Sequence, residues 1–401
     1  MLDLSQVAIQ IKTIVDQLKT SQQERQERLA LALRLLNDNT HDFSRLQAKA
    51  VGSQNTASFL IAGPVEPLPL RQPPIPTPLD FSIIATDGSQ IDVDRHQSAY
   101  CYLINIGRVQ IDYGHESNAK LESLPKLCAD DNSIVISDGY HEQVVKGELL
   151  GIRRSVDEFR HLRELAQGLP SSKPALAIVD GSLILWDLAS KEYPKFVVEE
   201  LLNKGFLQDL SVIKHLSQKQ PLALASYISY PRSTDVVNLL RMELCPFEYA
   251  DCRKHCRDKL LGNRPCNTIA GVLDRDLFLN HLADGERSAV FFSQAKMVTE
   301  KYEEHLIHFF YLRIEDEIAR VEIPLWIAKA PHLLNLTHTL LVDQCKRGGA
   351  YPIALSEAHE QAVVNSVDKE SFQHLLADWI TGEQMDYTYS AKSRTKKTRW
   401  L

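Results

Sequence analysis

The 401-residue chain lacks several features that would place it in a common class of protein. It has no apolar run of about 18 residues, so no membrane-spanning helix is expected. It has no G-x-x-x-x-G-K-[ST] nucleotide-binding loop, so any ATP-driven work must come from another protein. A dinucleotide-binding G-x-G-x-x-G turn after the first strand and a G-x-S-x-G nucleophile elbow are also absent.

The chain also has no excess of basic charge, since 45 Lys and Arg residues stand against 52 Asp and Glu residues. The net charge of −7 argues against a protein that coats DNA generally, but it leaves room for a local basic groove. The N-terminal segment is amphipathic and charged, unlike a signal peptide, so we expect a cytoplasmic protein. Its seven cysteines are then expected to be reduced thiols or metal ligands.

Changes in composition suggest a linear division of the chain. Apolar residues recur at helical spacing from residue 4 to about residue 50, which predicts an N-terminal helical segment over 1–63. The Pro-rich stretch 64–78 predicts a semi-rigid linker, and a main domain over 79–380 follows, with an insertion at about 242–285. The basic tail, 381–401, is either a solvated end or an arm that contacts phosphate.

The order of predicted elements in the main domain indicates its architecture. Strands are expected at 81–87, on either side of a turn at Gly107 within 99–114, at an edge position over 133–138, and over 175–186 and 221–228. Helices are expected over 148–168 and about 195–218, and a strand pair over 308–327 precedes two further helices. This order predicts an α/β fold with an RNase H-like mixed sheet flanked by helices. In that sheet the first strand lies parallel beside the strand that follows the first helix.

Two of these strands carry the same triplet, Asp-Gly-Ser. One is Asp87-Gly88-Ser89 at the end of FSIIATDGS, and the other is Asp180-Gly181-Ser182 within ALAIVDGSLILW. A single Asp-Gly pair usually marks a turn. Two triplets on neighbouring apolar strands instead predict two carboxylates side by side, the kind of ligands that hold Mg²⁺ or Mn²⁺ for phosphodiester chemistry.

A third acidic ligand is expected from the helix between the triplets, which offers Glu148, Glu158 and Glu164. On a helical wheel Glu158 falls at the edge of the apolar stripe, whereas Glu164 falls on the opposite face. Glu158 is therefore the better candidate, although a surface Glu at such a boundary is common. His359, early in the helix within YPIALSEAHEQAVV, is either a packed histidine or a group that orients a phosphate or acts as an acid or base.

These motifs together resemble the NurA family, the nuclease partner of the HerA ATPase in DNA end processing and repair. The resemblance rests on DGS at 87–89, Glu158, VDGSL at 179–183, SYISYPRS at 226–233 and YP…AH at 351–359. It implies Asp87, Glu158 and Asp180 as ligands of Mn²⁺ or Mg²⁺, with His359 and a tyrosine, best matched by Tyr227, completing the site. It also implies a homodimer with a DNA channel, fed by a hexameric HerA-type ATPase, with 5′–3′ exonuclease and single-strand endonuclease activity.

Outside that resemblance lies a group of four cysteines, Cys245, Cys252, Cys256 and Cys266, spaced C-x6-C-x3-C-x9-C. The spacing is not that of a zinc ribbon, but thiolates this close together are suited to Zn²⁺ or an iron–sulfur cluster. The alternative is a group of reduced thiols among Arg and Lys residues.

The sequence therefore favours a metal-dependent deoxyribonuclease in which Asp87 bridges two metal ions flanked by Glu158 and Asp180. The alternative is a non-catalytic adaptor that keeps the RNase H-like shell and binds DNA ends or the ATPase. Because the net charge repels DNA, a local basic face is expected beside the carboxylates. The residues expected to form that face are Arg153, Arg154, Arg232, Arg275 and Arg287.

Overall fold

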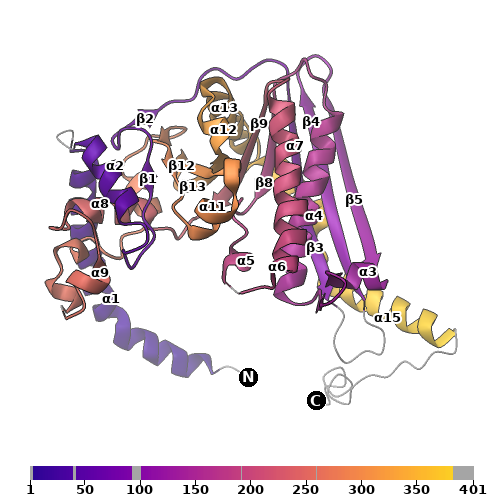
Figure 1. Cartoon of the computed structure of the whole chain (residues 1–401), viewed down its shortest axis with the longest axis horizontal. Coiled ribbons are helices and arrows are strands. Elements are labelled where there is room, and N and C mark those ends of the chain that lie inside the picture. The colour runs from indigo at the N-terminus through magenta and orange to yellow at the C-terminus, as the bar shows by residue number, and fades with distance from the viewer. Residues whose placement is uncertain (1–2, 39–41, 93–100, 191, 259, 383–401) are drawn as a thin grey trace. The chain divides into compact units, whose positions relative to one another are not determined.

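The computed structural model describes residues 3–38, 42–92, 101–190, 192–258 and 260–382 (Figure 1). The chain forms two compact units: unit 1 comprises residues 1–75 and 228–328, and unit 2 comprises residues 76–227 and 329–401. The first passage between the units falls within the Pro-rich stretch. Each unit is defined by contacts and combines two separate stretches of the chain. The domain boundaries proposed from the sequence at residues 63, 78 and 380 therefore stay a prediction. The basic tail lies outside the described residues.

Unit 2 is built on a mixed sheet with the strand order β9-β8-β3-β4-β5. Strands β3 and β8 pair in parallel, as do β8 and β9, whereas β4 is antiparallel to both β3 and β5. The predicted α/β class and RNase H-like order are confirmed, including the parallel neighbours that carry the two triplets. The strands are β3 (Phe81–Asp92), β4 (Tyr102–Tyr113), β5 (Asn118–Cys128), β8 (Ala175–Asp180) and β9 (Leu222–Ser229).

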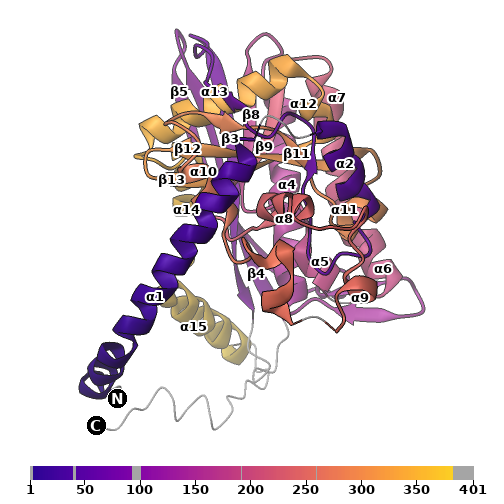
Figure 2. The ribbon, with the colours of Figure 1, turned by 90° about the vertical axis from the view of Figure 1, so that its left-hand side faces the viewer.

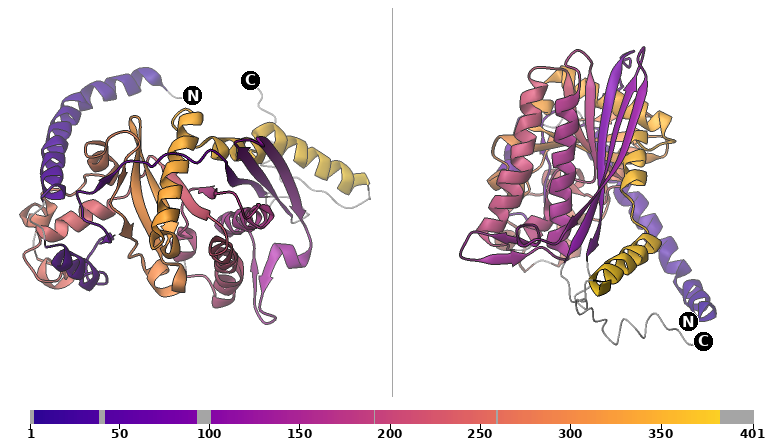
Figure 3. Two further views of the ribbon diagram at one scale, coloured as in Figure 1. Left: turned by 90° about the horizontal axis from the view of Figure 1, so that it is seen from above. Right: turned by 90° about the vertical axis from the view of Figure 1, so that its right-hand side faces the viewer.

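Helices cover both faces of this sheet (Figure 3). Paired residues of neighbouring strands share a face, and Gly107 of β4 pairs with Asp87 of β3, so Gly107 and Gly88 face opposite sides of the sheet. A Cβ on Gly107 would meet the backbone of α14, whereas a Cβ on Gly88 would meet α4. Helices α4 and α14 therefore lie on opposite faces, which explains why β3 and β8 are buried along most of their length. The helices of unit 2 are α3 (Asp131–Ile134), α4 (Glu148–Gly168), α5 (Trp186–Ser190), α6 (Lys195–Val198), the π-helix η1 (Glu199–Leu207), α7 (Gln208–Ser217), α13 (Pro331–Arg347), α14 (Ile353–Ala362) and α15 (Ser366–Gly382).

Three sequence-based predictions about unit 2 were wrong in detail. Gly107 does not mark a turn, because β4 runs unbroken through it and the glycine instead admits α14. The third strand is β5, whose charged, mostly exposed residues and Pro125 suit an edge strand and hide its pattern. The segment at 133–138 contributes β6 (Val135–Ser137), which pairs only with β7 (Glu142–Val144) in a separate two-stranded sheet.

Unit 1 packs a small sheet against helices. The expected strand pair is present as β12 and β13, and the expected N-terminal helical segment is two helices, α1 and α2. Asp42 caps α2, since its carboxylate accepts a hydrogen bond from the Arg45 amide at 3.0 Å. The elements are α1 (Leu4–Leu36), α2 (Phe43–Gly52), β1 (Gly63–Pro64), β2 (Arg71–Gln72), α8 (Asp235–Glu243), α9 (Cys252–His255), η2 (Leu261–Asn263), η3 (Pro265–Asn267), α10 (Asp274–Leu279), β10 (Arg287–Ser288), β11 (Phe291–Phe292), α11 (Lys296–Lys301), η4 (Glu303–His305), β12 (Ile307–Ile314), β13 (Glu317–Pro324) and α12 (Leu325–Ala328).

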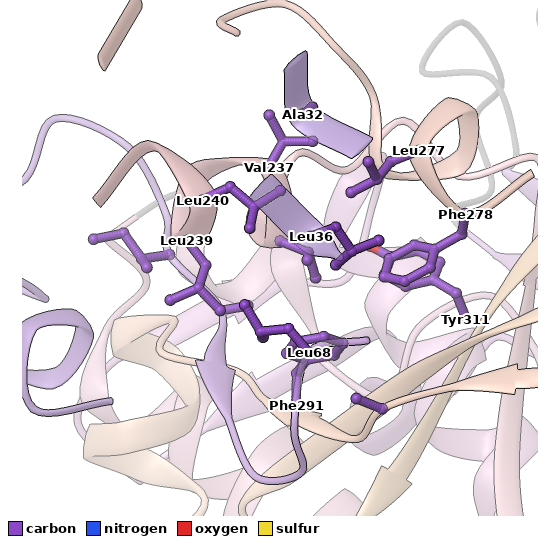
Figure 4. Close-up of a cluster of buried hydrophobic side chains, with 14 of the residues drawn as sticks. Ala32, Leu36, Leu68, Val237, Leu239, Leu240, Leu277, Phe278, Phe291 and Tyr311 are labelled. Carbon is purple, nitrogen blue, oxygen red and sulfur yellow. The ribbon is translucent and has the colours of Figure 1, made fainter. Parts of the chain in front are cut away.

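The core of unit 1 joins α1, α8 and α10 to the sheet. Leu36 of α1, Leu240 of α8, Phe278 of α10 and Tyr311 of β12 are fully buried in one cluster, where the rings of Phe278 and Tyr311 stack (Figure 4). Only the C-terminal part of α1 enters this core, whereas its N-terminal part extends away from α8 and α10 and exposes apolar side chains such as Ile9 (Figure 2). Among the described residues, no helix is long and apolar enough to cross a membrane.

Replacing Gly107 with Ala should destabilise the protein by roughly 2 kcal/mol, the scale of overpacking in a core. A Cβ there would lie 2.1 Å from the Ala358 carbonyl oxygen and 2.7 Å from the Ala362 amide nitrogen, so α14 would have to move. Urea denaturation measures the free energy of unfolding. Gly151→Ala is the control, because nothing lies within 4 Å of its added Cβ and Ala favours the helix. Equal stability of the two variants would show that α14 does not depend on this close contact.

Candidate active site

The two aspartates follow the last paired residues of two parallel strands. Thr86 of β3 pairs with Val179 of β8, and Asp87 and Asp180 come directly after them. Each carboxylate accepts a hydrogen bond from the next glycine, at 2.8 Å from the Gly88 amide and 3.0 Å from the Gly181 amide. Gly181 has φ of +85°, a conformation that favours glycine. The matched triplets thus place two carboxylates at one point on the sheet.

Glu158 reaches the same point from α4. A Cβ on Gly88 would lie 2.4 Å from Glu158 Oε1, so only glycine at this position lets the glutamate come so close to β3. The Thr86 hydroxyl donates a hydrogen bond to the Glu158 carbonyl oxygen at 3.0 Å, which fixes this turn of α4 against the strand. Glu164 instead points elsewhere, with its carboxylate 3.5 Å from Arg108.

The three carboxylates line one cavity of about 270 Å³. Phe159 and Phe206 form part of its apolar wall, and among the residues that the structure describes Arg154 is the one cationic side chain that lines it. The Arg154 Nε atom lies 2.9 Å from Glu158 Oε1, yet both of these buried atoms lack a hydrogen bond to any described residue. The cavity therefore combines crowded negative charge with polar atoms that are not fully satisfied.

The electrostatics of the site favour binding of a cation. Burial raises the pKa of Glu158 to about 8, opposed by Arg154 and reinforced by the nearby Asp87 and Asp180 carboxylates. Desolvation also raises the pKa of Asp180, against the hydrogen bond that it accepts from Tyr351, while Asp87 raises it further. Without a cation the site therefore keeps protons that a metal ion would displace.

His359 extends the site on the other face of the sheet. Its Nδ1 atom lies 2.8 Å from Asp87 Oδ2, and its side chain is 64% exposed. Helix α14 is held by its last carbonyls, since the Asn105 side chain donates to Gln361 O at 3.1 Å and to Ala362 O at 3.0 Å. The bond to Asp87 orients the imidazole and leaves its other nitrogen available to a ligand.

The tyrosine beside the carboxylates is Tyr351, which the sequence analysis did not single out. Its hydroxyl donates a hydrogen bond to Asp180. Tyr227, the residue proposed for this role, is 1% exposed and does not line the cavity. Its hydroxyl lies 3.7 Å from Cys345 Sγ and its ring packs edge-on against Tyr351, with 5.6 Å between the ring centroids. The sequence feature that could have identified Tyr351 is its position in the same YP…AH segment as His359.

The residues present suit a hard divalent cation such as Mn²⁺ or Mg²⁺. Three carboxylates share one cavity, and an oxygen of the buried one lacks a hydrogen bond in the described structure. No group of three His, Cys, Asp or Glu side chains in the described ranges is already arranged to hold a metal ion. Binding would therefore require the carboxylate side chains to rotate toward one another.

The second metal site proposed at the cysteines is not supported. Cys245, Cys252, Cys256 and Cys266 are half-buried free thiols, and in the described part of the chain they do not form a metal-holding group. A cation already lies among them, because the Arg241 side chain hydrogen-bonds to the Cys266 thiol and donates to the Cys266 carbonyl oxygen at 2.9 Å. Burial raises the pKa of Cys266 against the effect of Arg241, which disfavours the thiolate that a metal requires.

The arginines proposed for a basic face have different surroundings. Arg287 is 4% exposed and pairs with Glu66 at 2.9 Å in unit 1, so its proposed role was wrong. Arg275 lies over the Tyr230 ring and Arg232 is exposed, both in unit 1. In unit 2, Arg154 lines the cavity, whereas Arg153 lies 3.6 Å from Asp157 and outside the cavity.

Comparison with known proteins gives a consistent result. Residues 81–364 match the model of the NurA domain. A crystal structure of NurA bound to dAMP and manganese is 14% identical, covering 73% of this chain and 86% of its own, with a TM-score of 0.34. A structure of NurA with manganese is 12% identical over 84% and 94% (TM-score 0.30), and A. aeolicus Argonaute is 10% identical over 71% and 29% (TM-score 0.26). No curated protein matches.

Replacing Glu158 with Gln should change how stability depends on pH in metal-free buffer. The folded-state pKa of about 8 exceeds the ordinary 4.5, so between these values the folded protein binds more protons than the unfolded chain and loses stability as pH rises. Gln does not ionise. The variant should therefore gain stability relative to the wild type by on the order of 3 kcal/mol between about pH 5 and about pH 8, and no more above that. Urea denaturation across this range tests it, and a difference that is constant with pH would contradict it.

Proposed function

The chain belongs to the NurA domain family, and from this premise we propose that it is a metal-dependent deoxyribonuclease. One observation carries the proposal: acidic side chains from β3, α4 and β8 line a single cavity in unit 2. Carboxylates gathered at a sheet edge are the ligand set for the divalent ions used in phosphodiester hydrolysis. The proposed substrate is DNA, and the proposed ion is Mn²⁺ or Mg²⁺.

Each residue has a role that follows from its position. Asp87, Glu158 and Asp180 would hold the cation, which when bound supplies electrostatic stabilisation of the charge that develops on the phosphate oxygens. Arg154 faces the same cavity, and its guanidinium would contact a phosphate oxygen there. His359, oriented by Asp87, would exchange a proton with water or the leaving oxygen through its free nitrogen. Tyr351 keeps the Asp180 carboxylate in place.

Family membership supports finer proposals about the cellular role. These are 5′–3′ exonuclease and single-strand endonuclease activity in DNA end processing and repair, assembly as a homodimer around a DNA channel, and cooperation with a hexameric HerA-type ATPase. The absence of a nucleotide-binding loop in this chain agrees with a separate motor protein. The non-catalytic alternative is disfavoured because each expected acidic residue is present and lines the cavity.

Asp87→Asn, Asp180→Asn and Glu158→Gln should each lower Mn²⁺-dependent cleavage of labelled DNA by roughly a hundredfold or more, the scale of losing a charge that acts in the transition state. Rates on single- and double-stranded substrates, with and without Mn²⁺, provide the measurement. Glu164→Gln is the matched control on the same helix, and it should cleave at close to the wild-type rate because Glu164 pairs with Arg108 and His161. A wild-type protein that binds DNA but never cuts it would favour the adaptor, and equal losses at Glu158 and Glu164 would refute the site.

Substitutions of Tyr351 and of Tyr227 should affect Mn²⁺ binding differently. Tyr351→Phe removes the hydrogen bond to Asp180 and should weaken Mn²⁺ binding about tenfold or more, as loss of a group that supports a ligand does. Tyr227→Phe removes a hydroxyl that lies 3.7 Å from Cys345 Sγ and outside the cavity, so it should leave Mn²⁺ affinity unchanged. Calorimetric titration of Mn²⁺ measures both affinities. If Tyr227→Phe weakened binding more than Tyr351→Phe, the assignment would be reversed.

A further inference from the structure

The segment from Cys252 to Cys266 in unit 1 is strongly basic in a chain that is acidic overall. It contains five Lys or Arg residues and one Asp, a local charge of +4 against −7 for the whole chain. It follows α8 and includes α9, η2 and η3. Such an imbalance within fifteen residues creates a positive surface that the net charge conceals.

Three arginines of this segment line one cavity. The cavity has a volume of about 390 Å³ and contains no carboxylate in its lining. Arg253 and Arg257 are exposed, and neither forms an ion pair with any residue that the structure describes. We call this cavity the arginine pocket, lined by Ser58, Cys252, Arg253, Cys256, Arg257 and Arg264.

The backbone that carries these arginines is anchored within unit 1. The Cys252 amide donates to the Thr56 carbonyl oxygen at 3.1 Å, and the Asp251 carboxylate caps α9 by accepting from the Lys254 amide at 2.9 Å. Arg264 donates to the Cys256 carbonyl oxygen at 2.7 Å and so closes the segment on itself. Asp251, directly before the segment, is thus occupied with a helix end. Asp258, the one acidic residue within the segment, is exposed and does not line the pocket.

We propose that the arginine pocket binds the phosphate backbone of a DNA strand, at a place separate from the carboxylates of unit 2. The proposal rests on the proposed nuclease function for its ligand. Guanidinium groups match the geometry of phosphate oxygens, and an acidic protein needs such a local site to hold a polyanion. The exposed side chains of Arg253 and Arg257 suit an extended polymer that approaches from solvent. Cys252 and Cys256 then form part of the wall of the pocket.

The test is the salt dependence of DNA binding, measured by fluorescence anisotropy of a labelled single-stranded oligonucleotide in EDTA, where no cleavage occurs. The double variant Arg253→Gln/Arg257→Gln should bind about tenfold or more weakly, with a log–log salt slope shallower by about 1.4, the value for two lost phosphate contacts on a single strand. The control is Arg34→Gln/Lys301→Gln, which removes the same charge from exposed positions of unit 1. Binding equally affected in both variants, or a slope unchanged in the first, would overturn the proposal.

A second measurement locates the DNA directly. Saturating oligonucleotide should slow alkylation of the Cys252 and Cys256 thiols in the wild-type protein, because both line the pocket, relative to Cys245, which does not. Unchanged relative rates would contradict the proposal. Thymidine 5′-p-nitrophenyl phosphate has a single phosphodiester group and so offers no further phosphate to the arginine pocket. Its hydrolysis should be the same in Arg253→Gln/Arg257→Gln as in the wild type. If even the wild type fails to hydrolyse it, the proposed catalysis fails while the binding test still decides the pocket.

Discussion

The parallel pairing of β3 with β8 is the interaction on which the rest of the site depends. It places Asp87 and Asp180 directly after paired residues of neighbouring strands, so both lie at the same point on the sheet without any long-range adjustment of loops. The pairing requires a crossover through α4, and that same helix supplies Glu158. Gly88 and Gly107 then allow one helix to approach each face of β3 and β4 closely. The strand topology and the two glycines thus determine where the three acidic residues and His359 lie.

This arrangement has an electrostatic cost that the structure does not remove by itself. Burial raises the pKa of Glu158 and of Asp180, and the neighbouring Asp87 carboxylate raises both further. Arg154 opposes this only in part, and Tyr351 stabilises one carboxylate through a hydrogen bond. Functional sites commonly keep such strain because a ligand relieves it. A divalent cation is the ligand that relieves it most directly here.

Much of this site follows from short-range sequence signals. The repeated triplet, the wheel position of Glu158 and the order of strands and helices all report on local geometry, and the structure brings their residues to one cavity. The errors concern features that only tertiary packing decides. Gly107 was interpreted as a turn because its contact with α14 cannot be seen in the sequence. Strand β5 was missed because an edge strand is mostly exposed and lacks an alternating apolar pattern. The choice between Tyr351 and Tyr227 depends on which hydroxyl reaches Asp180, and packing places Tyr351 there. The cysteines lie close in sequence, but Arg241 lies among them.

The central claim is that the three carboxylates form a cation site whose occupation requires Glu158 to ionise. Calorimetric titration of Mn²⁺ into the protein at about pH 7, repeated in buffers with different ionisation enthalpies, measures metal binding and proton release together. The account predicts binding with release of about one proton per chain, lost when Glu158 is replaced by Gln because that side chain carries no proton to release. Tight Mn²⁺ binding without proton release, or no binding at all, would contradict it.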